Sequence, residues 1–147
     1  MQLTLHTDYS LRVLIYLAQK SDALATITEV ADFYQISRNH LVKVVHHLAG
    51  AGFIQTLRGK HGGMRLARAA DAITIGEVVR AMEPGFDLVE CFDVERQHCM
   101  VMPVCALKGV LKKAADEFLA VLDGYTLAEA VVGPLPAVFA KVKVENV

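Results

Sequence analysis

The sequence predicts a mainly α-helical protein with one small β-hairpin, built as a winged helix-turn-helix domain followed by a long dimerisation helix. Two short helical segments joined by a three-residue turn precede a glycine-rich hairpin, which is the order of elements in a winged helix. Further along, apolar residues recur at three- and four-residue steps between residues 105 and 123, which predicts one long amphipathic helix.

Three helices are predicted within residues 7–51, and the second and third, joined by the turn at 35–37, form the helix-turn-helix. A first helix begins at Thr7 or Asp8 and is apolar on most faces, so it should be well buried. Thr28 is the expected cap of the second helix, and Ser37 that of the third. The third helix has one apolar face, formed by Leu41, Val44, Val45 and Leu48.

A hairpin is predicted next, with strands at residues 53–57 and 64–67 around a turn rich in glycine and cations. Thr74 then begins a further helix, which ends near Met82 before Glu83-Pro84-Gly85. The predicted divisions of the chain are a winged helix-turn-helix domain (1–83), a cysteine-containing loop (84–105), a dimerisation helix region (106–132) and a tail (133–147).

Charge divides the chain into two unlike halves. The formal net charge is −1, but residues 1–70 carry eight Lys/Arg against four Asp/Glu, and residues 71–147 carry seven against twelve. A basic half beside an acidic half is typical of a DNA-binding region joined to a regulatory one. No apolar run is long enough to span a bilayer and no signal peptide is recognised, so we expect a cytoplasmic protein without a membrane partner.

The predicted DNA-binding surface joins the start of the third helix to the hairpin. Polar side chains in the first turns of a recognition helix reach base edges, and cations on a wing reach phosphates. The predicted DNA-binding residues are Ser37, Arg38, Asn39, His40, Lys43, Arg58, Lys60 and Arg65.

Three cysteines, Cys91, Cys99 and Cys105, lie within fifteen residues and are separated by seven and then five residues. An odd number of cysteines in a reducing compartment argues against disulfides. Structural zinc sites usually contain a close C-x2–4-C pair, which this sequence lacks. The spacing therefore favours an iron–sulfur cluster. The fourth ligand stays open among His98, a backbone or solvent group, and a distant carboxylate. A zinc-stabilised DNA-binding module, a cluster-free winged helix and a thiol enzyme using Cys99 beside His98 are the alternatives.

Several motifs in order resemble the IscR, NsrR and RirA group of iron–sulfur winged-helix regulators, over residues 1 to about 132. The matching motifs are MQLT (1–4), TDYSLR (7–12), SRNHLVK (37–43), RGKHGGMRL (58–66) and the three cysteines. Within the group, the Arg-Asn-His segment and Tyr125-Thr126-Leu127-Ala128 resemble the nitric-oxide-sensing branch.

The resemblance implies a homodimeric, non-enzymatic repressor of a palindromic double-stranded operator, with nitric oxide as effector. It implies one iron–sulfur cluster per subunit, 4Fe–4S favoured over 2Fe–2S, on Cys91, Cys99 and Cys105, with Asp8 of the other subunit as fourth ligand. The seven-residue spacing departs from several nitric-oxide sensors. It matches RirA-like iron sensors, as does Glu90-Cys91-Phe92, so an iron- or redox-responsive repressor is the alternative.

Overall fold

The computed structural model describes residues 2–20, 23–93, 95–96 and 98–131. Within these residues, helices and one hairpin follow one another as the sequence predicts, and the predicted fold class is confirmed. The elements are α1 (Leu5–Gln19), α2 (Ile27–Tyr34), α3 (Arg38–Gly50), β1 (Ile54–Leu57), β2 (Gly63–Leu66), α4 (Ile75–Met82) and α5 (Ala106–Asp123), with short 3-10 turns at Ala70–Ala72, Glu90–Phe92 and Met102–Val104. The predicted tail, 133–147, lies outside the described residues, and the domain boundaries remain predictions.

The helix starts differ from those expected. Helix α1 begins earlier, because the Thr4 hydroxyl accepts a hydrogen bond from the Thr7 backbone N–H at 3.3 Å. Helix α2 is capped by Thr26 rather than Thr28: the Thr26 hydroxyl accepts from the Glu29 N–H, and the Glu29 carboxylate accepts from the Thr26 N–H. Ser37 occupies the N-cap position of α3, but its side chain makes no capping hydrogen bond.

The hairpin is held to the helices through its second strand. Strands β1 and β2 pair antiparallel, with Gln55 opposite Arg65 and Thr56 opposite Met64. Met64 exchanges two backbone hydrogen bonds, of 3.0 and 2.8 Å, with Ala25, just before α2. The wing is therefore fixed relative to the helix-turn-helix by backbone contacts as well as by packing.

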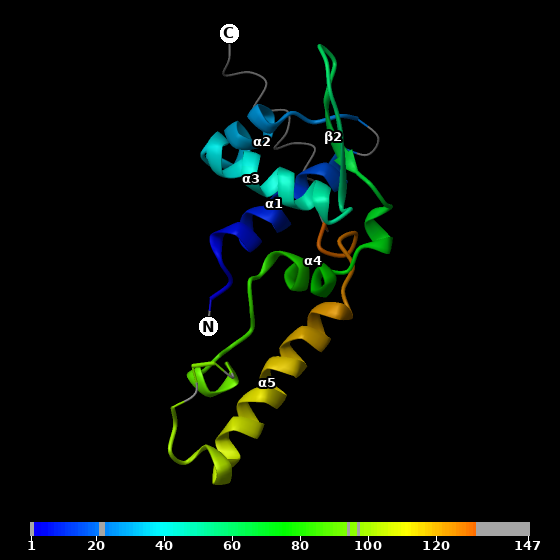
Figure 1. Ribbon diagram of the computed structural model, residues 1–147. Coiled ribbons are helices and arrows are strands. Elements are labelled where there is room, and N and C mark those ends of the chain that lie inside the picture. The colour runs from blue at the N-terminus through cyan, green and yellow to red at the C-terminus, as the bar shows by residue number, and fades with distance from the viewer. Residues whose placement is uncertain (1, 21–22, 94, 97, 132–147) are drawn as a thin grey trace.

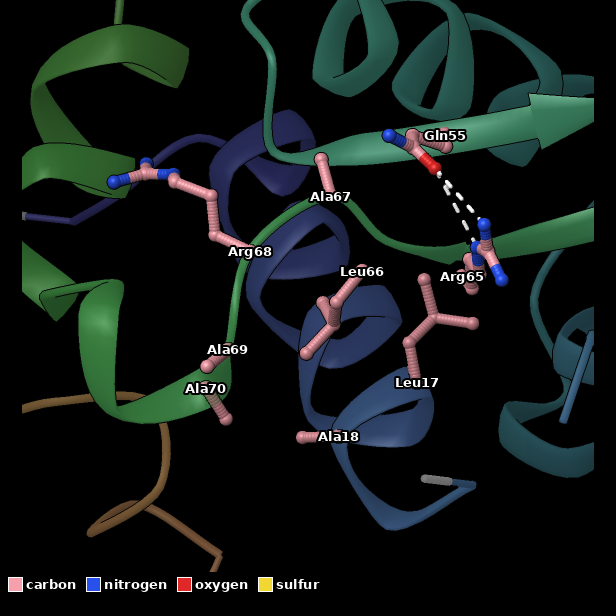
Figure 2. A pocket seen from close by; sticks show the side chains of 9 residues that line it. All are labelled: Leu17, Ala18, Gln55, Arg65, Leu66, Ala67, Arg68, Ala69 and Ala70. Carbon is pink, nitrogen blue, oxygen red and sulfur yellow. Dashed lines mark hydrogen bonds between the residues drawn. The ribbon is translucent and has the colours of Figure 1, made fainter. Parts of the chain in front are cut away.

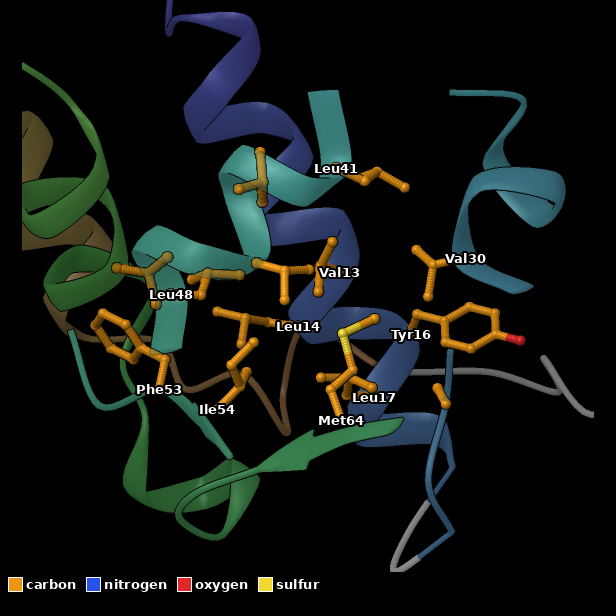
Figure 3. Close-up of a cluster of buried hydrophobic side chains, with 14 of the residues drawn as sticks. Val13, Leu14, Tyr16, Leu17, Val30, Leu41, Leu48, Phe53, Ile54 and Met64 are labelled. Atoms are coloured by element: carbon orange, nitrogen blue, oxygen red, sulfur yellow. The ribbon is translucent and has the colours of Figure 1, made fainter. Parts of the chain in front are cut away.

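One apolar core joins α1 to α4, the hairpin and Leu127 beyond α5, and we call residues 2–83 together with Leu127 the head. Figure 3 shows side chains from α1, α2, α3 and both strands meeting in this core. The largest fully buried side chains of the core cluster are Leu14, Leu17, Leu41, Leu48, Met64, Ile73, Leu127, Val13, Val30, Val44 and Val78. Burial of this apolar surface is the main stabilising contribution to the head.

Helix α5 projects from the head (Figure 1). Its first residue lies farthest from the head, and its last turn packs against α4. A Cβ at Gly76 would lie 2.8 Å from the Asp123 backbone nitrogen, so only glycine allows the end of α5 to approach α4 this closely. The Arg80 guanidinium forms an ion pair with the Asp123 carboxylate there. Within α5 itself only Ala115 is buried. Among the described helices, none is both long and apolar enough to cross a bilayer.

Candidate functional site

Helix α3 presents a continuous polar face to solvent. Arg38, Asn39, His40 and Lys43 are all exposed, and Ser37, just before the helix, is exposed as well. The opposite face carries the buried residues of the core, so the helix cannot rotate this face inwards. Five of the predicted DNA-binding residues therefore lie together on one accessible helix end.

A groove separates this helix end from the wing. It has a volume of about 420 Å³ and is lined by Arg38 of α3, Thr28 at the start of α2 and Thr56 of β1, among others. Because Ser37 makes no capping bond, its hydroxyl is also available at this end. The groove brings three chain segments together at the surface that the sequence predicts for DNA.

The wing places its cations in two different positions. Arg58 and Lys60 are exposed at the tip, where Gly59 has a φ of +110° that other residues rarely adopt. Arg65 instead points to the outer face of the hairpin, and Figure 2 shows its guanidinium against Gln55. Its Nε and Nη2 both donate to Gln55 Oε1 at 3.4 Å. The structure therefore separates Arg65 from the groove that contains Arg38.

The outer face of the wing forms one wall of a second open cavity, of about 520 Å³ (Figure 2). Leu17 and Ala18 of α1 lie on the opposite side of it, with the 66–70 segment between. Arg68 lines the cavity but already donates to the Ala72 carbonyl at 2.9 Å and pairs with Glu77. This cavity contains no group of converging polar side chains that would indicate a ligand.

The start of α1 contacts α3 through ring nitrogens. His6 Nε2 lies 2.9 Å from His47 Nδ1, and the two ring centroids are 5.1 Å apart. Burial and the neighbouring His47 lower the pKa of His6 below 6.5, although Glu83 opposes this. A second ring contact, at 6.3 Å between centroids, joins Tyr9 to His40. Two residues of α1 thus touch the helix that carries the DNA-facing side chains.

Asp8, the predicted fourth metal ligand, is paired with Arg12 one turn later on α1. Arg12 Nε donates to Asp8 Oδ1 at 3.1 Å, and Nη2 lies 2.9 Å from Oδ2. This hydrogen bond raises the pKa of Arg12 above its ordinary value. The Arg12 guanidinium also lies 5.9 Å from the ring centroids of Tyr9 and Tyr34. Both charged side chains remain about 40% exposed, at 39% for Asp8 and 43% for Arg12.

Glu83, at the end of α4, anchors the N-terminus of α1. Its carboxylate accepts from the Thr4 N–H at 3.2 and 3.3 Å, from the Thr4 hydroxyl at 3.1 Å, and from the hydroxyl of the buried Thr7. These charge-assisted bonds fix α1 at the point where the connector towards the cysteines begins. We call residues 84–105 the connector.

The three cysteines lie along the connector and all are free thiols. Figure 1 shows the connector leaving α4, forming the turn that contains Cys91 and reaching the start of α5 at the far end. Cys99 is exposed, and Cys105 is partly buried at the N-cap of α5. Across the described residues, no three His, Cys, Asp or Glu side chains are gathered closely enough to hold a metal ion.

Three contacts of the site were not predicted from the sequence. Glu83 is separated from Thr4 by 79 residues, so no local pattern could have linked them. Gln55 and Arg65 are ten residues apart in a hairpin, and a correct strand register would have predicted their pairing. His6 and His47 are 41 residues apart, so their contact could not be predicted from a local pattern either.

Comparison with known proteins identifies relatives of the whole described chain. The Rrf2 family, described as "Iron-dependent Transcriptional regulator", matches residues 3–133. The HTH-type transcriptional regulator NsrR of Bacillus licheniformis is 52% identical over 132 residues, covering 89% of this chain and 92% of that protein. NsrR of Bacillus subtilis is 50% identical, covering 89% and 90%.

A solved structure supports the same assignment. CymR, the global cysteine regulator of B. subtilis, superposes with a TM-score of 0.72 at 27% identity and covers 89% of this chain and 96% of its own. The resemblance to the NsrR branch that the sequence indicated is confirmed, and the relatives are regulators rather than enzymes. The chain therefore belongs to the Rrf2 family of transcriptional regulators.

Proposed function

We propose that this chain is a homodimeric repressor that releases a palindromic DNA operator when nitric oxide attacks an iron–sulfur cluster. The cluster, one 4Fe–4S group per subunit, would be held by Cys91, Cys99 and Cys105, with Asp8 from the partner subunit. The observation that carries the proposal is a polar, exposed end of α3 that contacts α1, while Glu83, just before the segment with three free thiols, binds the start of α1.

Contacts to DNA follow from the exposed side chains. Arg38, Asn39 and Lys43 present hydrogen-bond donors where a recognition helix meets base edges. Arg58 and Lys60 at the wing tip suit phosphate contacts, because a glycine turn lets the backbone come close. Arg65 would join them only by leaving Gln55, a weak pair at 3.4 Å.

The apolar face of α5 supports a dimer. Leu107, Val110, Ala114 and Val121 are exposed at steps of three, four and seven residues, which keep them on one face of the helix, and Tyr125 continues the line. Such a stripe on a helix that already packs its other face against α4 and the connector fits a second copy of the same helix. Pairing two α5 helices would place two heads side by side, as a palindromic operator requires.

The residues of the connector fit an iron–sulfur cluster in their chemistry. Three unpaired thiols within fifteen residues are a suitable soft donor set, and none is committed to a disulfide. When bound, the cluster supplies iron that reacts with nitric oxide. To bind it, the cysteines must draw the connector together, since among the described residues no three His, Cys, Asp or Glu side chains lie close enough to hold a metal ion.

Asp8 and His6 give α1 a part in the response. For Asp8 to be a ligand in the partner subunit's site, its carboxylate must break its ion pair with Arg12 and bind the cluster instead. His6 lies two positions earlier on the same helix and contacts His47 of α3. A change at the Asp8 carboxylate therefore acts on the helix that positions the DNA-binding surface.

The test measures operator affinity of anaerobically purified protein by fluorescence anisotropy, before and after adding nitric oxide. We expect nitric oxide to weaken operator binding by the parent several thousand-fold, because full switching needs roughly 5 kcal/mol. Cys91→Ser should bind weakly under both conditions and lack the absorbance of a cluster. Met100→Ser is the matched control, since Met100 is a neighbouring, exposed sulfur side chain. Triple serine replacement that leaves full affinity and a full response would overturn the proposal.

An iron-responsive repressor is the second candidate, because the family description names iron-dependent regulators. The two functions differ in the signal that releases DNA. Removing free iron with a chelator, under anaerobic conditions and without nitric oxide, should leave a nitric-oxide sensor on its operator. Release by the chelator together with indifference to nitric oxide would favour the iron-responsive function.

A further inference from the structure

The exposed face of α3 contains one apolar side chain among polar ones. Within α3, all of which the structure describes, Val42 is the one large apolar side chain that is exposed, at 47%. Its apolar neighbours Leu41 and Val44 are buried. Val42 lies three and four positions after Asn39 and Arg38, so it shares their side of the helix, one turn further along.

The described part of the chain leaves about half of this valine open to solvent. Helix α5, whose apolar stripe could otherwise pack against it, extends from α4 away from α3 (Figure 1). The exposed side chains next to Val42 are polar, including Lys43 and His46. A partner for Val42 must therefore be an apolar group that lies among hydrogen-bonding groups.

The major groove of DNA offers one such group, the C5 methyl of thymine. We infer that Val42 determines specificity by packing on a thymine methyl group in each half-site of the operator. This inference rests on the proposed role of α3 in DNA binding. Valine suits this role because its branched Cβ leaves one preferred rotamer in a helix, so ordering the side chain against a methyl costs little entropy.

The experiment replaces thymine by deoxyuridine, which removes only the methyl group. An operator is first obtained by selecting binding sequences from a random pool with the parent protein. Each thymine of the half-site is then exchanged in turn, in both half-sites together, and affinity is measured by anisotropy. We expect one position at which the parent loses about fourfold per half-site, or about 15-fold in all, as expected for one buried methyl group each.

Val42→Ala should bind the thymine operator less tightly by a similar factor and should lose nothing further with deoxyuridine at that position. Alanine has a higher helix propensity than valine, so this exposed substitution should leave folding intact, and circular dichroism checks it. Val42→Thr keeps the branched shape and one methyl group, and it should retain part of the sensitivity.

Two outcomes overturn the inference: no thymine position at which the parent responds, or equal responses of the parent and Val42→Ala. The control Arg38→Ala separates this failure from that of the proposed function. If Arg38→Ala binds every sequence as tightly as the parent, the DNA-binding surface itself is wrongly placed. If Arg38→Ala loses binding while Val42→Ala keeps the parent's thymine sensitivity, only the assignment of Val42 fails.

Discussion

The head and the connector with α5 are stabilised in opposite ways. In the head, every helix places apolar side chains in one shared core, and polar groups such as Glu29 and Glu83 have several partners. In α5, one residue is buried and three large apolar side chains, Leu107, Val110 and Val121, are exposed, as is Val104 just before the helix. The head is complete within one chain, whereas the other half presents surfaces and thiols that need partners.

This difference indicates how a regulator can keep its DNA-binding surface intact while its response depends on something bound elsewhere. A preformed head needs no ligand to fold, so a signal need only change how two heads are placed. A connector with few buried contacts opens at low free-energy cost, and it is the part expected to reorganise. Making the same kind of substitution in each region tests this contrast directly.

The largest expected effect comes from the same truncation made in both regions. Leu48 is fully buried in the head, and Leu107 is 61% exposed on α5. Leu48→Ala should lower the free energy of unfolding by about 2–5 kcal/mol, because it leaves a cavity in a packed core. Leu107→Ala should lower that of the separated subunit by less than about 1 kcal/mol, because Leu107 is exposed within one chain. Urea unfolding in a Val110→Glu background, which is expected to be monomeric, measures both, and equal losses would show that α5 is packed as tightly as the head.

A charge on the α5 stripe tests whether this surface is completed by a second copy. Val110→Glu should raise the dimer dissociation constant by at least about 100-fold, since a buried unpaired charge costs several kcal/mol. Ala120→Glu, also exposed on α5 but off the stripe, is the control. Sedimentation equilibrium gives the association state. A Val110→Glu protein that remains as dimeric as the control would place the interface elsewhere.

The same contrast explains what the sequence could predict. Elements of the head were predictable in kind and order because apolar spacing reports burial within the chain, as at Leu41, Val44 and Leu48. Helix starts were less predictable, because Thr4 and Thr26 compete with nearby residues of equal capping ability. Thr4 is selected as a cap by its hydrogen bond to Glu83. Thr26 is selected by its hydrogen bond to Glu29. For Glu83 the decisive contact is tertiary.

The candidate site divides in the same way. The exposure of Arg38, Asn39 and Lys43 followed from their place opposite an apolar face. The ion pair of Asp8 with Arg12 joins residues four positions apart and can be predicted locally. The proposed role of the same carboxylate as a cluster ligand involves a second subunit, which no local pattern describes. The cysteine spacing indicates a donor set without fixing its geometry, because the connector has little regular structure of its own.

The smallest expected effect lies within the head and concerns a charge. The Glu29 carboxylate accepts from the Tyr16 hydroxyl at 3.0 Å, from Lys20 and from the Thr26 N–H, joining α1 to α2. Burial raises the pKa of Glu29, but the hydrogen bonds from Lys20, Thr26 and Tyr16 outweigh burial, so the pKa is lowered overall from its ordinary 4.5.

Because the pKa of Glu29 is lowered by folding, its ionised form stabilises the head fully above about pH 4.5, and this contribution is lost as the pH falls through the folded-state value. Glu29→Gln keeps the shape and most hydrogen bonds but removes the charge, so it should cost about 1 kcal/mol at pH 7. Urea unfolding of cluster-free protein should show this difference shrinking towards zero at acid pH. A difference that stays constant down to pH 3 would show that packing and capping, rather than the charge, account for the role of Glu29.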